Sequence, residues 1–133
     1  DVMADDKQKF VKILVVEDDE ASRAIIARFL DQLGFSNVVL AENGRAALNE
    51  LNLNQIDLVI SDWRMPDMDG LELYWSAKNE GLLDNTPFLM VSAENEKGKV
   101  IEALRAGVND YIVKPVDSKT LKDKIEKLLS SQE

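Results

Sequence analysis

The sequence contains neither cysteine nor histidine, and each absence excludes whole classes of chemistry. Without cysteine there is no disulfide, no thiolate nucleophile and no cysteine metal site. Without histidine there is no Ser-His-Asp triad, no imidazole acid–base catalyst and no phosphohistidine on this chain. No apolar run approaches the ~20 residues that span a bilayer. Any metal site on this chain must therefore be built from oxygen ligands.

Glycine is sparse as well, and none of the six glycines forms a Gly-rich dinucleotide loop or a P-loop, which argues against a nucleotide enzyme. Lysine and arginine (16) are outnumbered by aspartate and glutamate (25), so the net charge of −9 argues against nucleic acid or an anionic membrane as the main partner. Residues 97–127 are an exception, with 8 basic against 5 acidic residues, so the last third is locally basic.

Five apolar runs of strand length alternate with five segments of helical spacing in these 133 residues. The predicted strands lie at residues 10–16, 38–41, 58–60, 88–91 and 111–113. The run at 58–60 is bounded by turn residues, which is typical of a strand buried on both faces. This alternation predicts one doubly wound α/β domain with a parallel sheet, over residues 10–130, after a flexible extension at residues 1–9.

Capping residues and glycine stops predict where the helices begin and end. Candidate N-caps precede the first, second and last helices: Asp19, Asn43, and Asp117 or Ser118. The fourth helix is expected over residues 95–106, with its larger apolar side chains facing the core: Val100, Ile101 and Leu104.

Polar side chains follow four of the predicted strands: Asp18 and Asp19, Asp62, Ser92 and Lys114. In a parallel sheet the carboxyl ends of the strands meet at one edge, which is where ligands bind. Each residue alone has an ordinary alternative role, because Asp19 and Ser92 can cap helices, Asp62 can accept from loop amides, and Lys114 can be solvated. Their joint placement predicts one site.

Carboxylates that follow the first and third strands would lie close together if those strands are neighbours. At roughly 4 Å and an effective dielectric near 20, two such charges repel by about 4 kcal/mol. Either one carboxylate is protonated or a cation lies between them, and oxygen ligands favour a hard ion such as Mg²⁺. With Lys114 and Ser92 available to contact phosphoryl oxygens, Asp62 is the candidate nucleophile that forms an acyl phosphate.

Two other chemistries fit the residues less well. A calcium loop at residues 67–70 has incomplete ligand spacing and no glutamate at the twelfth position. A Mg²⁺-dependent hydrolase with an aspartate nucleophile would need a second aspartate two residues after Asp62, where Arg64 stands.

Over residues 11–130 the chain resembles the receiver domain of two-component response regulators. Four motifs carry the resemblance in order: Ile13 to Asp18, Asp62 with Met65 to Gly70, Val91 to Ala93, and Tyr111 to Pro115. The resemblance implies a flavodoxin-like sheet of strand order 2-1-3-4-5 and a cytoplasmic protein.

The resemblance also implies a phosphoacceptor and a metal site. Asp62 would accept a phosphoryl group from the phosphohistidine of a histidine kinase. Mg²⁺ would be held by Asp18, Asp62 and the backbone carbonyl of Arg64, with Glu17 acting through water. Glu17 stands where aspartate is commoner in the family. Such a protein catalyses its own phosphorylation and dephosphorylation but is not a conventional enzyme.

Ser92 and Lys114 would bind the phosphoryl group, Tyr111 would be the switch aromatic, and the bond before Pro115 would be cis, as is usual in the family. Arg64 and Glu94 stand at the mouth of the site, where we expect them to tune dephosphorylation by pairing with each other or by contacting phosphate. The alternative is two solvated side chains.

The resemblance is strongest to the chemotaxis regulators of this family. It implies a partner face on the fourth helix, fifth strand and fifth helix, which would bind a protein target such as the flagellar motor switch: Lys97, Val100, Tyr111 and Lys124. We expect a module without an output domain. A fragment of a larger regulator or hybrid kinase, or a phosphorelay intermediate, stays open.

Overall fold

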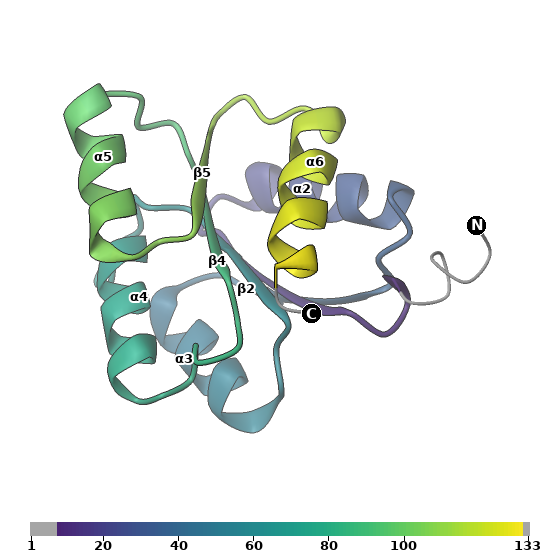
Figure 1. Cartoon of the computed structure of the whole chain (residues 1–133), viewed down its shortest axis with the longest axis horizontal. Helices are drawn as coiled ribbons and strands as arrows, with labels where there is room; N and C mark the ends of the chain where they lie inside the picture. Colours follow the sequence, from purple (N-terminus) through teal and green to yellow (C-terminus); the bar gives the residue numbers. More distant parts are fainter. Residues whose placement is uncertain (1–7, 132–133) are drawn as a thin grey trace.

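The computed structural model describes residues 8–131, which form a five-stranded parallel sheet between two layers of helices (Figure 1). The strands are β1 (Lys12–Val16), β2 (Asn37–Ala41), β3 (Leu58–Ser61), β4 (Phe88–Ser92) and β5 (Asp110–Val113). The helices are α2 (Glu20–Gln32), α3 (Gly44–Leu53), α4 (Gly70–Asn79), α5 (Lys97–Ala106) and α6 (Ser118–Ser130). The strand order, β2-β1-β3-β4-β5, is the predicted one. Most of the predicted extension lies outside the described residues.

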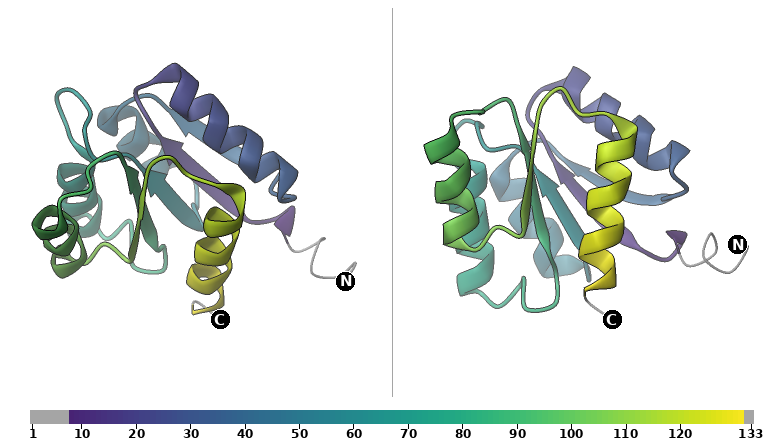
Figure 2. Two further views of the ribbon diagram at one scale, coloured as in Figure 1. Left: turned by 90° about the horizontal axis from the view of Figure 1, so that it is seen from above. Right: turned by 45° about the horizontal axis from the view of Figure 1, so that its top comes forward.

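The sheet separates two apolar clusters, each covered by its own helices. Helices α2 and α6 cover one face, and α3, α4 and α5 cover the other (Figures 1 and 2). Alternate residues of β1 point to opposite faces, so Ile13 and Val15 pack toward α2 and α6 while Leu14 and Val16 pack into the other cluster. The inner strands β1, β3 and β4 are therefore apolar except at Lys12, Ser61 and Ser92, as expected for strands buried on both faces.

The three predicted helix caps are confirmed. Asp19, Asn43 and Asp117 each accept a backbone hydrogen bond of 2.8 Å in the first turn of α2, α3 and α6. Asp69 caps α4 by accepting a 2.8 Å hydrogen bond from the backbone N–H of Glu72, and the Glu72 carboxylate accepts a 3.0 Å bond from the backbone N–H of Asp69. The sequence prediction missed this reciprocal capping box.

Two predictions about apolar residues are wrong. Phe10 precedes β1 and is 80% exposed, because the strand begins only at Lys12. Helix α5 begins at Lys97, and its predicted inward residues Ile101 and Leu104 are 36% and 42% exposed. The buried residue of α5 is Ala103, so this helix rests on the sheet through a narrow stripe. Helical periodicity does not say which of several apolar stripes faces the core.

Backbone hydrogen bonds carry three of the predicted site residues to one edge of the sheet. The N–H of Glu17 donates to Ala41 O at 3.0 Å, and the N–H of Asp62 donates to Val16 O at 3.0 Å. The N–H of Lys114 donates to Ser92 O at 2.8 Å. The sheet thus extends one residue past β1, β3 and β5, and the side chains at these positions emerge together. Across residues 8–131, no helix has the length and apolarity needed to cross a membrane.

Candidate functional site

Three carboxylates meet at the carboxyl edge of the sheet. Glu17 and Asp18 follow β1, Asp62 follows β3, and one oxygen from each lies within 4.8 Å of the others. Glu17 is 1% exposed and Asp62 8%, whereas Asp18 is exposed to solvent. All the donors are oxygens and one side of the cluster is open, so the residues fit a hard divalent cation that keeps some of its waters.

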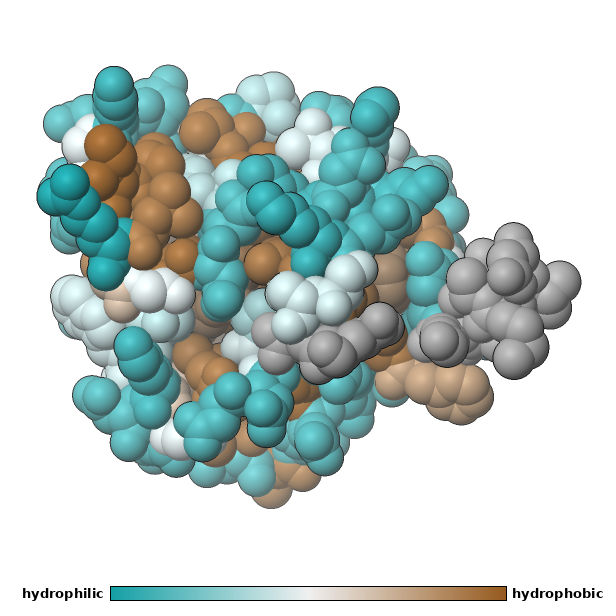
Figure 3. Space-filling model, viewed as in Figure 1, coloured by the Kyte–Doolittle hydropathy of each residue, from teal (hydrophilic) through white to brown (hydrophobic). Residues whose placement is uncertain are grey.

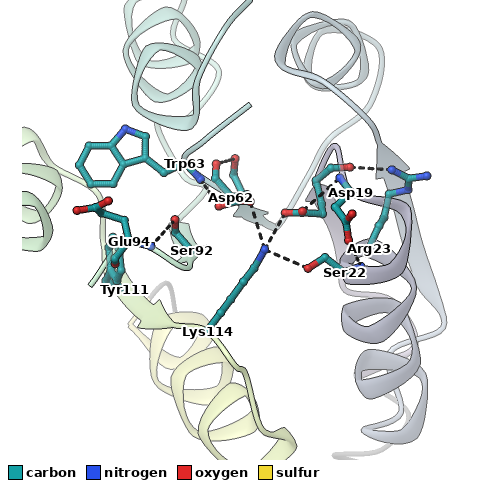
Figure 4. A network of polar contacts seen from close by, with 11 residues as sticks. Asp19, Ser22, Arg23, Asp62, Trp63, Ser92, Glu94, Tyr111 and Lys114 are labelled. Atoms are coloured by element: carbon teal, nitrogen blue, oxygen red, sulfur yellow. Dashed lines mark hydrogen bonds and ion pairs between the residues drawn. The ribbon is translucent and has the colours of Figure 1, made fainter. Parts of the chain in front are cut away.

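Lys114 reaches this cluster from the end of β5 (Figure 4). Its Nζ lies 3.2 Å from Asp62 Oδ2, 3.3 Å from Glu17 Oε2 and 3.1 Å from Ser22 Oγ. Burial by itself would lower the pKa of Lys114, but attraction by Asp62 and then Glu17 outweighs it, so the pKa is raised. The ammonium is therefore a permanent positive charge beside Asp62. The peptide bond between Lys114 and Pro115 is cis, as the resemblance implies.

Glu17 is the carboxylate whose protonation the site changes most. Burial raises the pKa of Glu17 from its ordinary value of 4.5 to about 7; Asp62 adds to the rise, and Lys114 opposes it. Since this pKa is higher in the folded than in the unfolded chain, the folded protein holds the proton more tightly. The stability that this proton contributes is full below about pH 4.5 and is lost as the pH rises through about 7.

We therefore expect Glu17→Gln to gain stability relative to wild type as the pH is raised in metal-free buffer. The gain between about pH 5 and about pH 8 should be on the order of 2 kcal/mol, which follows by linkage from a pKa of about 7 in the folded chain against 4.5 in the unfolded chain. Urea unfolding in EDTA measures it. The exposed Glu80, changed to Gln, is the control and should follow wild type. A difference between Glu17→Gln and wild type that is constant with pH would contradict the assignment.

The loop after β3 holds Asp62 through its backbone. The N–H of Trp63 donates to Asp62 Oδ1 at 2.6 Å, and the N–H of Gly70 donates to Trp63 O at 2.7 Å, which closes the loop. A Cβ at position 70 would overlap Asp62 O, so only glycine allows the start of α4 to approach this closely. The Asp62 carboxylate is thereby fixed with Oδ2 directed at Lys114.

Ser92 and Tyr111 meet at the far side of the site. Ser92 is fully buried at the end of β4, and its hydroxyl accepts a 3.2 Å hydrogen bond from the N–H of Glu94. The Tyr111 hydroxyl donates to the backbone carbonyl of Glu94 at 2.8 Å, and burial raises the pKa of this phenol. At 8% exposure, Tyr111 lies inward in this structure, with its ring 6.3 Å from that of Trp63 in an edge-on arrangement.

Arg64 and Glu94 form the ion pair that was one of the two predicted arrangements. Arg64 Nη2 lies 3.3 Å from Glu94 Oε2. The guanidinium also stacks over the Trp63 ring, 5.2 Å from its centroid. The Arg64 side chain is 58% exposed and that of Glu94 22%, so the pair lies at the surface of the site and is screened by water.

The predicted partner face is mixed in its exposure. Lys97 is exposed and Val100 is half-buried, whereas Lys124 makes a 2.9 Å ion pair with Asp110. The most exposed apolar residues of α5 and β5 are Ile101, Leu104 and Val113. None of them was among the residues predicted for the partner face. Figure 3 shows apolar side chains gathered over the α5 corner of this face. Tyr111 lies beneath the surface.

Two residues of α2 belong to the site although no motif pointed to them. Ser22 accepts from Lys114, and Arg23 Nη1 donates to the backbone carbonyl of Glu17 at 2.8 Å (Figure 4). Asp19, by contrast, caps α2, and its N–H donates to Glu17 Oε1 at 3.3 Å. A serine and an arginine in the first turn of a helix are common in any sequence, so the sequence carried no signal for their role.

Residues 13–126 match the family model of the response regulator receiver domain. Among curated relatives, the chemotaxis protein CheY of Pseudomonas aeruginosa is 42% identical over 118 residues, covering 89% of this chain and 95% of the relative. The chemotaxis protein CheY-3 of Vibrio cholerae is also 42% identical, over 120 residues, covering 90% of this chain and 92% of the relative.

Solved structures show the same likeness. The chemotaxis protein CheY4 of Vibrio cholerae superposes with a TM-score of 0.82 at 30% identity, covering 90% of this chain and 98% of that one. The receiver domain of the Francisella response regulator 1452 superposes with a TM-score of 0.84 at 29% identity, covering 92% and 99%. The fold is therefore shared along at least 90% of this chain.

Proposed function

Because the chain belongs to the response regulator receiver domain family, we propose that it is a signalling switch operated by phosphorylation of Asp62. The observation that carries the proposal is the position of this carboxylate. Asp62 lies in a cluster of three carboxylates and 3.2 Å from the Lys114 ammonium, at the carboxyl edge of a parallel sheet. The receiver domain spans residues 10–130 in this proposal, and the protein acts in the cytoplasm.

The donor in this proposal is the phosphohistidine of a histidine kinase. An oxygen of Asp62 attacks phosphorus as the phosphorus–nitrogen bond breaks, and the imidazole leaves with the electron pair and takes up a proton. The product is an acyl phosphate on Asp62. Lys114 and the Ser92 hydroxyl contact its phosphoryl oxygens and offset their charge. Hydrolysis returns the carboxylate when water attacks phosphorus and the acyl oxygen leaves.

The residues that would hold Mg²⁺ are Asp18, Asp62 and the backbone carbonyl of Arg64, with Glu17 acting through water. The donor chemistry supports this set, because the nearby carboxylate oxygens suit a hard cation. When bound, the ion would neutralise charge on the phosphoryl group as it transfers. Glu17 and Asp62 repel each other whenever both are ionised, and Lys114 offsets that repulsion.

The output of the switch would be a population shift on α5, β5 and α6. An acyl phosphate on Asp62 favours the arrangement in which Ser92 and its loop turn toward the phosphoryl group and Tyr111 lies inward. The basic and apolar residues of that face then bind a protein target. Relatives named as chemotaxis proteins support a target of the flagellar motor switch type.

Intact-mass spectrometry tests the proposal directly. Acetyl phosphate and Mg²⁺ should add about 80 Da, the mass of one phosphoryl group, to the protein. Absence of the adduct under conditions in which a known receiver domain is labelled would contradict the proposal.

Arg64→Ala is expected to shorten the lifetime of the acyl phosphate by about twofold to fivefold, the range of an exposed ion pair. In this proposal the pair of Arg64 with Glu94, 3.3 Å apart, limits the approach of water to the acyl phosphate. Loss of the adduct is followed by mass after the phosphodonor is removed. Arg105→Ala, an exposed arginine on α5, is the control.

A double-mutant cycle separates the two ways in which Arg64 could act. If it acts through the ion pair, Glu94→Gln should reproduce the effect, and the double variant should lose no more than either single variant. An unchanged lifetime in Arg64→Ala rejects the role.

A further inference from the structure

The Lys114 ammonium has three N–H donors, and the structure places an acceptor near each of them. The acceptors are Ser22 Oγ at 3.1 Å, Asp62 Oδ2 at 3.2 Å and Glu17 Oε2 at 3.3 Å. Two of them are carboxylates of the proposed metal site. The third is a neutral hydroxyl on another element, the first turn of α2 (Figure 4).

Ser22 is held firmly enough to orient a partner. Its backbone N–H donates to the capping carboxylate of Asp19 at 2.8 Å, so it lies in the anchored first turn of α2. The next residue, Arg23, ties the same turn to the backbone of Glu17. The first turn of α2, which carries the Ser22 hydroxyl, is therefore held by the Asp19 carboxylate and by the bond from Arg23 to the backbone of Glu17.

A hollow beside Lys114 shows which side chains can contact its ammonium from the direction of α2. A hollow of about 260 Å³ lies between α2 and the segment after β5, lined by Ser22, Ile25, Ile26, Lys114, Pro115 and Val116. Apart from Lys114 itself, Ser22 is the only polar residue of this lining. The remaining residues of the lining are apolar and have no acceptor side chain. In this hollow the Ser22 hydroxyl is therefore the side-chain acceptor for the Lys114 ammonium.

We propose that Ser22 is a positioning residue for Lys114 in phosphoryl transfer to Asp62, an inference that rests on the proposed function. When Asp62 becomes an acyl phosphate, its oxygen loses its charge, and the N–H of Lys114 that was bonded to Asp62 Oδ2 becomes available to a phosphoryl oxygen. Ser22 and Glu17 keep the other two N–H groups, so the third is directed at the incoming group before it arrives. Such preorganisation lowers the barrier, because the donor need not be oriented during the reaction.

Three variants test the role. Ser22→Ala removes the acceptor, Ser22→Thr keeps a hydroxyl, and Ser76→Ala changes a half-buried serine of α4, on the other face of the sheet. With acetyl phosphate and Mg²⁺, Ser22→Ala should gain the mass adduct about threefold to tenfold more slowly than wild type, the worth of one hydrogen bond. Ser22→Thr and Ser76→Ala should each stay within about twofold of wild type.

A second measurement needs no phosphodonor. In protein labelled with ¹⁵N-lysine, the Lys114 ammonium should exchange its hydrogens with water faster in Ser22→Ala than in wild type. Protection should be kept in Ser22→Thr and in Ser76→Ala. The same spectra show that each variant is folded.

The outcomes separate this role from the proposed function. A wild-type adduct with an unchanged rate in Ser22→Ala overturns the role of Ser22 alone, as does Lys114 exchange that does not change in that variant. Slowing in Ser22→Thr equal to that in Ser22→Ala also overturns it, because the hydroxyl would then not be the cause. Absence of any adduct on the wild-type protein overturns the proposed function and this role together.

Discussion

Asp62→Asn is expected to abolish the phosphoryl adduct, so that treatment with acetyl phosphate and Mg²⁺ leaves the intact mass unchanged. An amide has no anionic oxygen to attack phosphorus, and the acyl phosphate cannot form on it. The substitution keeps the shape of the side chain and an oxygen that can accept the 2.6 Å hydrogen bond from Trp63 N–H. The loss would therefore report on chemistry at one oxygen and not on the fold.

The control for this variant is Asp67→Asn in the same loop. Asp67 is exposed and has a backbone φ of 70°, a left-handed conformation that asparagine tolerates well. Asp67→Asn should gain the adduct as wild type does. An adduct of about 80 Da that persists in Asp62→Asn would place the phosphoryl group elsewhere and refute the central claim.

Trp63 fluorescence shows whether Asp62→Asn also weakens the binding of Mg²⁺. Trp63 is 3% exposed and adjacent to the carboxylate, whereas Trp75 is 47% exposed and contributes background. Removing one of three clustered carboxylates lowers the charge available to the ion, so the midpoint of the titration should move to higher Mg²⁺.

Lys114→Met is expected to destabilise the metal-free protein by on the order of 3 kcal/mol at about pH 8, because it leaves two buried carboxylates without their cation. Methionine keeps most of the aliphatic length of lysine, so the effect reports mainly on charge. The loss should be smaller at about pH 6, since the pKa of Glu17 is about 7 and a proton can then replace the ammonium. Urea unfolding in EDTA measures both values.

Lys119→Met is the matched control for Lys114→Met. Lys119 pairs with Asp123 at 3.1 Å, but its side chain is 86% exposed, and such a pair contributes less than about 1 kcal/mol. Adding Mg²⁺ should restore stability to Lys114→Met more than it stabilises wild type, because the ion would supply the missing positive charge. Equal losses in the two lysine variants would show that Lys114 does not compensate the carboxylates.

The prediction of a common site rested on one feature of parallel sheets. Asp62 and Lys114 are the first residues after β3 and β5, and the carboxyl ends of parallel strands meet at one edge. Strand β4 lies between β3 and β5, so the length of the lysine side chain is needed to bring Nζ of Lys114 to 3.2 Å from Asp62 Oδ2, although 52 positions separate the two residues in the chain. The prediction worked because both the position after a strand and the edge at which it emerges follow from local pattern and topology.

The faces of the helices were predicted less well. Ile101 and Leu104 have the spacing of a buried stripe, yet α5 contacts the sheet through Ala103 and leaves both larger residues exposed. Which stripe is buried depends on how the helix is rotated on the sheet, and a pattern with several apolar positions allows more than one rotation. The exposed stripe is the one that the proposed target would cover.

By itself, the sequence determined the alternation of strands and helices, the strand order through its family motifs, and the carboxylates and lysine that gather at one edge. Only the tertiary structure decided that Ser22 lies beside Lys114, 92 positions away, that Arg64 pairs with Glu94, and that Tyr111 lies inward. The physical reason is that a residue following a strand is placed by backbone pairing, which local pattern predicts. A residue on a helix or in a loop is placed by the packing of whole elements against one another.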